Sequence, residues 1–310
     1  MDRNISSLPF QFLDDVQYNV AEKALAISLP ICILGFIGNS IILWILCCRL
    51  RIKLNLYFVC VAAANNIMAF SIIAEYIMFF NPDTFSWMYH KILDILHLSS
   101  HIASFYIFAV IAVERWCIHF FPVWYKQSRP LNFSAIVSFS LWGLTSLTSV
   151  IVHYLCSPVL EVHFKEVQTC TTSTVTLIIT QSIFIPCMIF FPLGIWIRIH
   201  MKQKEVPPQR FDVTIVATVL FYLMLIAPFK LATILMYWFR NINGPMLGSL
   251  HTLLESIIST ISPFIYLIVG SWKKPKVETA YAFLELALTD KTPLLVKTQT
   301  QTLKNQQLYA

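Results

Sequence analysis

Ionisable side chains stand inside several of the longest apolar stretches of this 310-residue chain. Two of them, Lys230 and Glu255, lie in the two apolar stretches nearest the C-terminus. Further polar side chains lie within or at the ends of other stretches: Glu75, Asp94, His97, His101, Tyr106 and His153. A charge at the centre of a bilayer costs at least about 2.5–3.5 kcal/mol, so each such group needs a partner or a ligand. The chemistry open to them is charge pairing or ligand binding in an outer cavity.

Lys230 and Glu255 carry opposite charges on neighbouring stretches, so they could form an ion pair. Two interpretations stay open, because such a pair can fix helix packing or can contact a ligand. The histidines need the same care, since a lone histidine on an apolar face is more often satisfied by a neighbour than used on a ligand.

Composition identifies the medium in which these groups must be placed. Hydrophobic residues make up 57% of the chain and charged residues 12%, and the mean hydropathy is +0.68. Soluble proteins carry about 25% charged residues and about 45–50% apolar residues. These values exclude a cytosolic enzyme, a disordered protein and a disulfide-rich mini-protein, and they indicate an integral membrane protein. The net charge of +6 is no indication of nucleic-acid binding.

Seven stretches are long and apolar enough to cross a bilayer, which takes about 20 residues in a helix. They are Ala24–Cys48, Leu54–Ala74, Asp94–Glu114, Pro130–Leu160, Val167–Ile197, Asp212–Phe239 and Asn241–Trp272. None alternates between polar and apolar residues as the strands of a membrane barrel do. The predicted fold is an all-α membrane protein, a seven-transmembrane helix bundle. Proline inside these stretches is compatible with membrane helices.

Lys and Arg in the short connections predict the orientation. Twelve lie on the side of the C-terminus and five on the other side, so we expect the N-terminus outside and the C-terminus in the cytoplasm. Residues 1–23 then form an outer tail with a glycosylation sequon at Asn4, residues 24–272 the membrane domain, and residues 273–310 the cytoplasmic tail. The tail's basic and apolar beginning predicts a short amphipathic helix at the membrane surface.

Landmarks inside these stretches resemble those of G-protein-coupled receptors. They occur in the receptor order: Gly38-Asn39, Glu114-Arg115, Trp142, Pro228 and Ser262-Pro263-Phe264-Ile265-Tyr266. Longer segments resemble the Mas-related receptors, above all Phe121-Pro122-Val123-Trp124-Tyr125 with Arg129-Pro130, and Val269-Gly270-Ser271. The resemblance extends from Gly35 to about Lys274.

The resemblance implies a plasma-membrane receptor, not an enzyme, with no cofactor and no metal. A ligand, either a peptide or a small molecule, would bind in the outer half and shift a two-state equilibrium. A heterotrimeric G protein would be contacted at the cytoplasmic end through Glu114, Arg115, Pro122 and Tyr266, with Arg115 released from Glu114 on activation.

The resemblance also implies a disulfide between Cys156 and Cys170, as in Mas-related receptors. These two cysteines flank the second outer connection, in an oxidising environment. The bridge to span three found in most receptors of the class is excluded, because no cysteine lies between Cys60 and Cys117. Two unpaired outer thiols remain the alternative.

Several positions depart from the receptor patterns. His97 stands where amine receptors carry an aspartate, so an amine ligand is not expected. The acids that flank the outer cysteines in peptide- and cation-sensing relatives are replaced by Val152 and Thr174, which favours a neutral, hydrophobic or acidic ligand. Asn65 and Ser262 replace an aspartate and an asparagine, so sodium should bind weakly or not at all.

Two functions from other classes stay open. A small channel or transporter could use Lys230, Glu255 and the histidines as an ion path. A seven-helix protein could also bind a ligand or a partner without coupling to a G protein, which the neutral residues Asn65 and Ser262 make plausible.

Overall fold

The computed structural model describes the backbone of residues 8–48, 56–81, 86–128, 130, 132–155, 164–202, 210–239, 244–272, 283–284 and 287–288. Side chains are described for these residues except 8–21, 87, 126, 128, 155, 164–175, 202, 229, 231–239 and 244–249. This part of the chain forms helices α1 (Leu8–Cys48), α2 (Leu56–Phe80), α3 (Trp87–Phe120), α4 (Pro122–Ser128), α5 (Phe133–Leu155), α6 (Phe164–Lys202), α7 (Arg210–Phe239) and α8 (Gly244–Ser271), and contains no strand.

Seven of these helices are long and apolar enough to cross a membrane, and each overlaps one of the seven predicted stretches. The predicted all-helical bundle is therefore confirmed. Two differences concern boundaries: α1 begins at Leu8, well before the apolar run, and the segment after α3 forms the short helix α4 in place of a loop. Pro122 suits the first position of α4, because the backbone N–H that proline lacks has no partner there.

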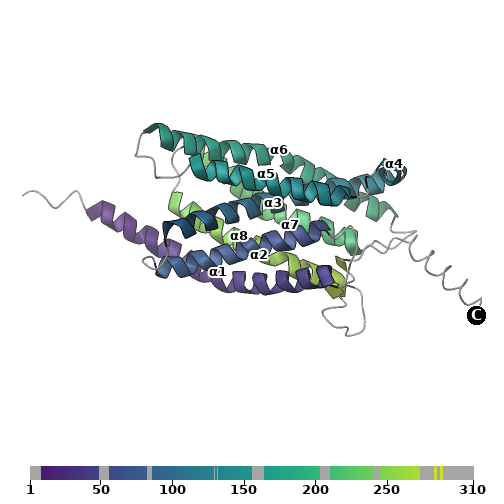
Figure 1. Ribbon diagram of the computed structural model, residues 1–310, viewed down its shortest axis with the longest axis horizontal. Coiled ribbons are helices and arrows are strands. Elements are labelled where there is room, and N and C mark those ends of the chain that lie inside the picture. The colour runs from purple at the N-terminus through teal and green to yellow at the C-terminus, as the bar shows by residue number, and fades with distance from the viewer. Residues whose placement is uncertain are drawn as a thin grey trace, which may run out of the picture.

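Helix α3 is the central element of the bundle. It contacts α2, α5, α6 and α7, whereas α1 packs against α2 and α8 at the edge. In Figure 1 the seven long helices lie side by side along the long axis, and α4 stands at one end, next to the end of α3. Side chains of α3 can therefore meet partners from most of the other helices.

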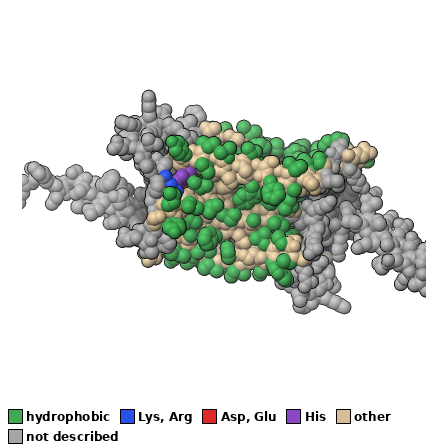
Figure 2. Space-filling model, viewed as in Figure 1, with side chains coloured by type: hydrophobic (Ala, Val, Ile, Leu, Met, Phe, Trp, Pro, Cys, Tyr) green, Lys and Arg blue, Asp and Glu red, His purple; other side chains and the backbone are tan. Residues whose placement is uncertain are grey.

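The outer surface of the bundle is apolar. Phe139 of α5 is 73% exposed, Met224 of α7 74% and Ile268 of α8 68%. Figure 2 shows hydrophobic side chains spread over the visible face, with histidine and basic side chains only near one end of the part described. A bilayer accounts for this surface, because lipid tails solvate apolar side chains and the helices satisfy their own backbone groups.

Helices α1 and α8 approach each other closely at Gly35. A Cβ atom at this position would overlap the side chain of Thr260, whose hydroxyl donates a hydrogen bond to the carbonyl of Ile31 at 2.9 Å. One turn further on, Asn39 donates to the carbonyls of Gly35 at 2.9 Å and Ser259 at 2.7 Å. The absence of a side chain at Gly35 therefore permits hydrogen bonds between the two helices.

The described tail residues pack against the ends of α7 and α8. Arg210 donates to the carbonyls of Gly270 at 2.7 Å and Trp272 at 3.0 Å, and Thr214 donates to the carbonyl of Ala287 at 3.2 Å. Leu284, Ala287 and Leu288 are buried. Residues 273–282, where the amphipathic helix is expected to begin, lie outside the described residues.

Gly35→Ala is expected to lower the melting temperature of the purified protein by about 5 °C, because overpacking of a tight contact costs about 1–3 kcal/mol. Gly143→Ala is the matched control, since a Cβ there meets no atom within 4 Å. The measurement is a thermal melt in lipid nanodiscs. A Gly35→Ala protein that melts at or above the temperature of the control would contradict the packing described.

Candidate functional site

Glu255 of α8 is the centre of a buried polar cluster. Its Oε2 lies 3.1 Å from His97 Nε2, and its Oε1 lies 3.0 Å from His101 Nδ1 and 3.1 Å from His251 Nε2. The side chain of Glu255 is only 4% exposed. His97 and His101 are four positions apart on α3, and His251 and Glu255 are four positions apart on α8, so each pair lies on one face of its helix. Three imidazoles from two helices thus surround one carboxylate.

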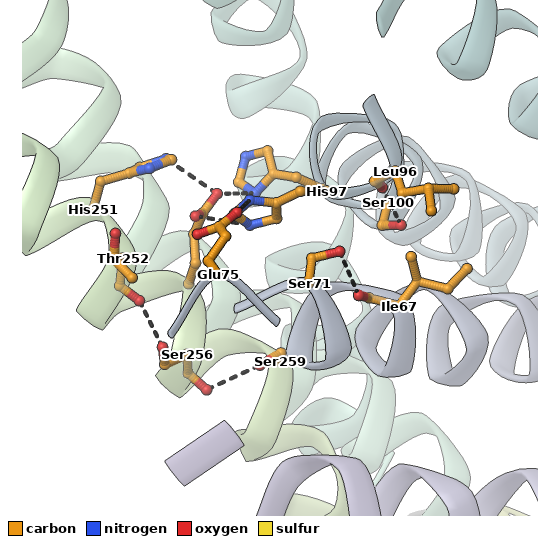
Figure 3. Close-up of polar contacts among 12 residues, drawn as sticks. Ile67, Ser71, Glu75, Leu96, His97, Ser100, His251, Thr252, Ser256 and Ser259 are labelled. Carbon is orange, nitrogen blue, oxygen red and sulfur yellow. Dashed lines mark hydrogen bonds and ion pairs between the residues drawn. The ribbon is translucent and has the colours of Figure 1, made fainter. Parts of the chain in front are cut away.

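Helix α2 adds a second carboxylate to this group. Glu75 Oε1 lies 3.5 Å from His97 Nδ1, on the opposite side of the ring from Glu255. Figure 3 shows Glu75, His97 and His251 directed toward the same point from three helices. Glu75 is 29% exposed and His251 35%, so water reaches the cluster from its edge. Glu75, His97, His101, His251 and Glu255 are called the Glu255 cluster below.

Lys230 of α7 has a different partner from the one considered from the sequence. It donates to Oε1 of Gln181 on α6, and its ammonium lies 5.4 Å from the centre of the Phe105 ring. Lys230 is 5% exposed and Gln181 2%. The ion pair with Glu255 is not seen in the part of the chain that the structure describes, because Lys230 contacts α6 and α3, whereas Glu255 contacts histidines.

Asp94, Tyr106 and His153 are not among the residues of the cluster. Asp94 is exposed on α3, close enough to His97 and His153 for an electrostatic interaction. His153 of α5 is half-buried. Tyr106 contacts Phe184 of α6 edge to face, with ring centres 5.3 Å apart. The sequence thus identified Glu75, His97, His101 and Glu255 as candidates, and the structure brings these four together.

A neutral polar group joins α2, α3 and α8 in the middle of the bundle. Ser104 donates to Asn65 Oδ1 at 3.3 Å, and Asn65 Nδ2 donates to the hydroxyl of Ser262 at 3.5 Å. All three side chains are buried, with Asn65 1% exposed. Asn65, Ser104 and Ser262 are called the neutral layer below, because their contacts join the helices without an ionised group.

A second charged group lies at the end of α3 next to α4. Arg115 Nη1 lies 3.7 Å from Asp212 Oδ1 of α7, and His119 Nε2 lies 3.0 Å from Asp212 Oδ2. The side chains of Arg115 and Asp212 are 4% and 2% exposed. The guanidinium also lies 4.1 Å from the centre of the Phe211 ring. Arg115, His119 and Asp212 are called the Arg115 lock, because they join α3 to α7.

Glu114 and the other residues expected at this end also have partners. The hydroxyl of Tyr125 on α4 donates to Glu114 Oε1, so the short helix is attached to α3. Pro122 is the first residue of α4 and is exposed. Tyr266 is buried, with its ring edge to face against Phe58 at 6.0 Å between centres. Phe58 in turn contacts Phe211 at 5.4 Å. Aromatic rings therefore connect α8 and α2 to the Arg115 lock.

Asp212, His119 and His251 were not singled out in the sequence. For Asp212 the available signal was a lone carboxylate at the beginning of an apolar stretch. The sequence did not indicate which side chain would be its partner. His251 precedes Glu255 by four residues, a spacing that places both side chains on one helix face. Asn4 and Cys156 lie outside the described residues, as does the side chain of Cys170.

The chemistry open to these groups is the exchange of contacts between helices. In the described residues no three His, Cys, Asp or Glu side chains are arranged to hold a metal ion. What the structure does bring together is two sets of charged contacts, one at each end of α3. Both join different helices, so a change in either would move helices relative to each other.

Comparison with known proteins gives relatives along most of the chain. No family model matches it. The chain is 27% identical over 288 residues to human Mas-related G-protein coupled receptor member X1, covering 88% of this chain and 87% of the relative. It is 28% identical over 314 residues to the rat protein of the same name, covering 94% of each. It is 26% identical over 247 residues to the rat proto-oncogene Mas, covering 78% and 76%. The predicted likeness to Mas-related receptors is confirmed.

Sodium is expected to have no effect on the stability of the unmodified protein. A neutral amide and two hydroxyls offer no negative charge to compensate a sodium ion for the hydration that it loses. Asn65→Asp, in contrast, places a carboxylate between Ser104 and Ser262. For the variant, a sodium concentration of about ten times the dissociation constant should raise the melting temperature by about 3 °C.

The measurement compares melts in sodium chloride and in the chloride of a large organic cation at equal ionic strength. Asn66→Asp is the matched control, since Asn66 donates to Ser40 at 3.2 Å outside the neutral layer. A melting temperature of the unmodified chain that depends on sodium would show that the neutral layer binds the ion after all.

Proposed function

We propose that this chain, a seven-helix homologue of the Mas-related G-protein-coupled receptors, transmits the binding of an extracellular ligand to a heterotrimeric G protein. The named relatives are receptors rather than enzymes. The observation that carries the proposal is the Arg115 lock, in which the arginine next to Glu114 is paired with Asp212 of α7.

The lock gives a physical account of an inactive state. Arg115 is held by the Asp212 carboxylate and by the face of Phe211, both on α7. Outward movement of α7 would remove both contacts together and leave the guanidinium free for an acceptor on the G protein. The sequence led us to expect that Glu114 restrains Arg115. The contacts of Arg115 add Asp212 to this restraint, and Glu114 accepts a hydrogen bond from Tyr125.

We place the α4 end of the bundle in the cytoplasm of a plasma-membrane receptor. The support is the excess of Lys and Arg in the connections on that side. The N-terminus is then extracellular, with Asn4 available for glycosylation and Cys156 and Cys170 in an oxidising environment, where we propose their disulfide. Pro122 and the rest of α4 belong to the proposed G-protein surface, because Tyr125 of α4 is bonded to Glu114, the residue before Arg115.

The ligand site is proposed in the outer half, between the Glu255 cluster and Lys230. Lys230 offers a buried cation, with Gln181 and the Phe105 ring beside it. The positions that carry acids in peptide- and cation-sensing relatives are the neutral Val152 and Thr174. An acidic or neutral ligand therefore fits this site better than a strongly basic peptide.

Arg115→Ala is expected to reach the membrane and to lose at least about tenfold in nucleotide exchange on the G protein. A hydrogen bond to a charged group contributes about 1.5–3 kcal/mol, which corresponds to that factor. The measurement is the exchange rate of purified G protein with the receptor in nanodiscs. Arg198→Ala is the control, since it removes a cation at the same end, where Arg198 lies over the Phe120 ring.

Undiminished exchange by Arg115→Ala would overturn the coupling role. If the unmodified receptor gives no exchange with any G protein while it binds ligands, the second function considered, binding without coupling, is supported. Currents carried by the protein in liposomes would support a channel or transporter.

Asp212→Asn is expected to raise basal exchange by about tenfold. Removing one partner of a buried ion pair leaves the other charge uncompensated, and here that cost falls on the locked state alone. Asp212→Glu retains the charge and should restore exchange to within a few fold of the unmodified receptor. The readout is exchange without ligand at matched receptor amounts. Equal basal rates in all three proteins would show that the Arg115–Asp212 pair does not restrain activation.

A further inference from the structure

His97 lies between two carboxylates on different helices. Its Nδ1 faces Glu75 Oε1 of α2 at 3.5 Å and its Nε2 faces Glu255 Oε2 of α8 at 3.1 Å. Figure 3 shows Glu75 and His97 close together, beside the part of α8 that carries His251. The side chain of His97 is 17% exposed, so the arrangement is largely shielded from solvent.

This arrangement requires one proton more than a neutral imidazole supplies. A neutral ring has a hydrogen on one nitrogen and a lone pair on the other. The lone pair would then face an anionic oxygen, which is repulsive. An added proton removes the repulsion whether it resides on the ring or on the carboxylate. The two contacts therefore indicate one extra proton without assigning it to one atom.

The other two histidines make no such demand. His101 and His251 each present one nitrogen to Glu255 Oε1, at 3.0 and 3.1 Å. A neutral imidazole can donate one N–H in each case, and one carboxylate oxygen accepts two hydrogen bonds. His97 differs from them because each of its two nitrogens faces a different carboxylate.

The groups around His97 leave the site with an excess of negative charge. Glu75 faces it from α2, Glu255 and His251 from α8, and Asp94 and His101 lie on its own helix. Lys230 and Tyr222 of α7 and Cys32 of α1 lie within electrostatic range of the cluster. Among the described residues whose electrostatic interactions are given above, three carboxylates are thus set against one permanent cation, Lys230, whose hydrogen bond goes to Gln181.

We propose that the receptor senses extracellular protons, and that a proton bound between Glu75, His97 and Glu255 stabilises the locked conformation. The proposal rests on the proposed function for its orientation and readout. The same conformation contains the proton-requiring contacts and the closed Arg115 lock. The locked state therefore binds this proton more tightly than a state in which α2, α3 and α8 separate.

The sign of the effect follows from linkage. The state that binds the proton more tightly gains population as pH falls, so acidification favours the lock and lowers basal activity. As pH rises the proton is lost, the lone pair of His97 faces a carboxylate, and the contact between α2 and α8 weakens. Coupling between two sites commonly amounts to about 5–150-fold, which sets the scale of the response.

The first arm of the experiment measures basal nucleotide exchange at pH 8 and pH 6 with the full chain in nanodiscs and EDTA throughout. We expect exchange by the unmodified receptor to fall at least about fivefold on acidification. His97→Gln keeps a donor and an acceptor but takes up no proton, so its ratio of rates at the two pH values corrects for the pH dependence of the G protein itself.

Two more variants complete this arm. Glu75→Gln removes one of the two carboxylates at a partly exposed position, so it tests the bridge even if His97→Gln folds poorly. It should reduce the pH response to that of His97→Gln. His90→Gln is the matched control, because His90 is an exposed imidazole on the same helix outside the Glu255 cluster. It should respond to pH as the unmodified receptor does.

A second arm separates this proposal from the proposed function. The melting temperature of each protein at pH 8 and pH 6, without any G protein, reports proton binding by the receptor alone. A rise at pH 6 in the unmodified chain that both Glu75→Gln and His97→Gln abolish supports the proton site even where no exchange is seen, in which case the coupling function fails by itself.

Three results would overturn the proposal. One is an equal pH dependence of the melt in the unmodified chain and in both variants. Another is basal exchange that rises on acidification, which would assign the proton to the active state. The third is a response seen only without EDTA, which would identify a metal ion as the occupant.

Discussion

Polar groups inside a bilayer must find partners within the protein, and helix α3 provides partners at three levels of the bundle. Its side chains pair with α8 and α2 near the beginning, at His97, with α2 again at Ser104, and with α7 near the end, at Arg115. An unsatisfied polar group in hydrocarbon costs several kcal/mol. The central position of α3 is the arrangement that allows one helix to satisfy groups from several others.

The sequence contained most of the fold and about half of the site. Membrane helices are predictable because their length and apolar composition are set by the bilayer, and each of the seven expected stretches overlaps one of the seven long helices. The pairs of side chains that meet between helices are not predictable in this way, because they depend on the rotation of each helix about its axis. Lys230 faces Gln181 and not Glu255 for this reason, although both acid and base were identified as buried charges.

Asp212 illustrates the same limit at the other end of the bundle. Its type and position at the start of α7 were visible, but only the packing of α7 against α3 shows that it meets both Arg115 and His119. The helix α4 was not predicted for another reason: it has only seven residues, and so short a helix has no long apolar run. A hydrogen bond from Tyr125 to Glu114 attaches it to α3.

The two charged groups of α3 cannot communicate through a continuous chain of charges. His97 and Arg115 are separated by about 27 Å along the helix, at about 1.5 Å per residue. Between them lies the neutral layer, where Asn65, Ser104 and Ser262 join α2, α3 and α8 without an ionised side chain among them. Electrostatic influence over that distance is weak, so a signal must be carried by the helices as bodies.

Helices α8 and α2 each contribute to the Glu255 cluster and to the aromatic contacts beside the Arg115 lock. Helix α8 contributes Glu255 to the Glu255 cluster, and its Tyr266 contacts Phe58 of α2, which packs on Phe211 beside the Arg115 lock. A shift of α8 or α2 that breaks the contacts of His97 therefore displaces the rings on which Arg115 and α7 rest. Because Arg115 contacts the adjacent residues Phe211 and Asp212, such a displacement removes its stacking and its ion pair in one step.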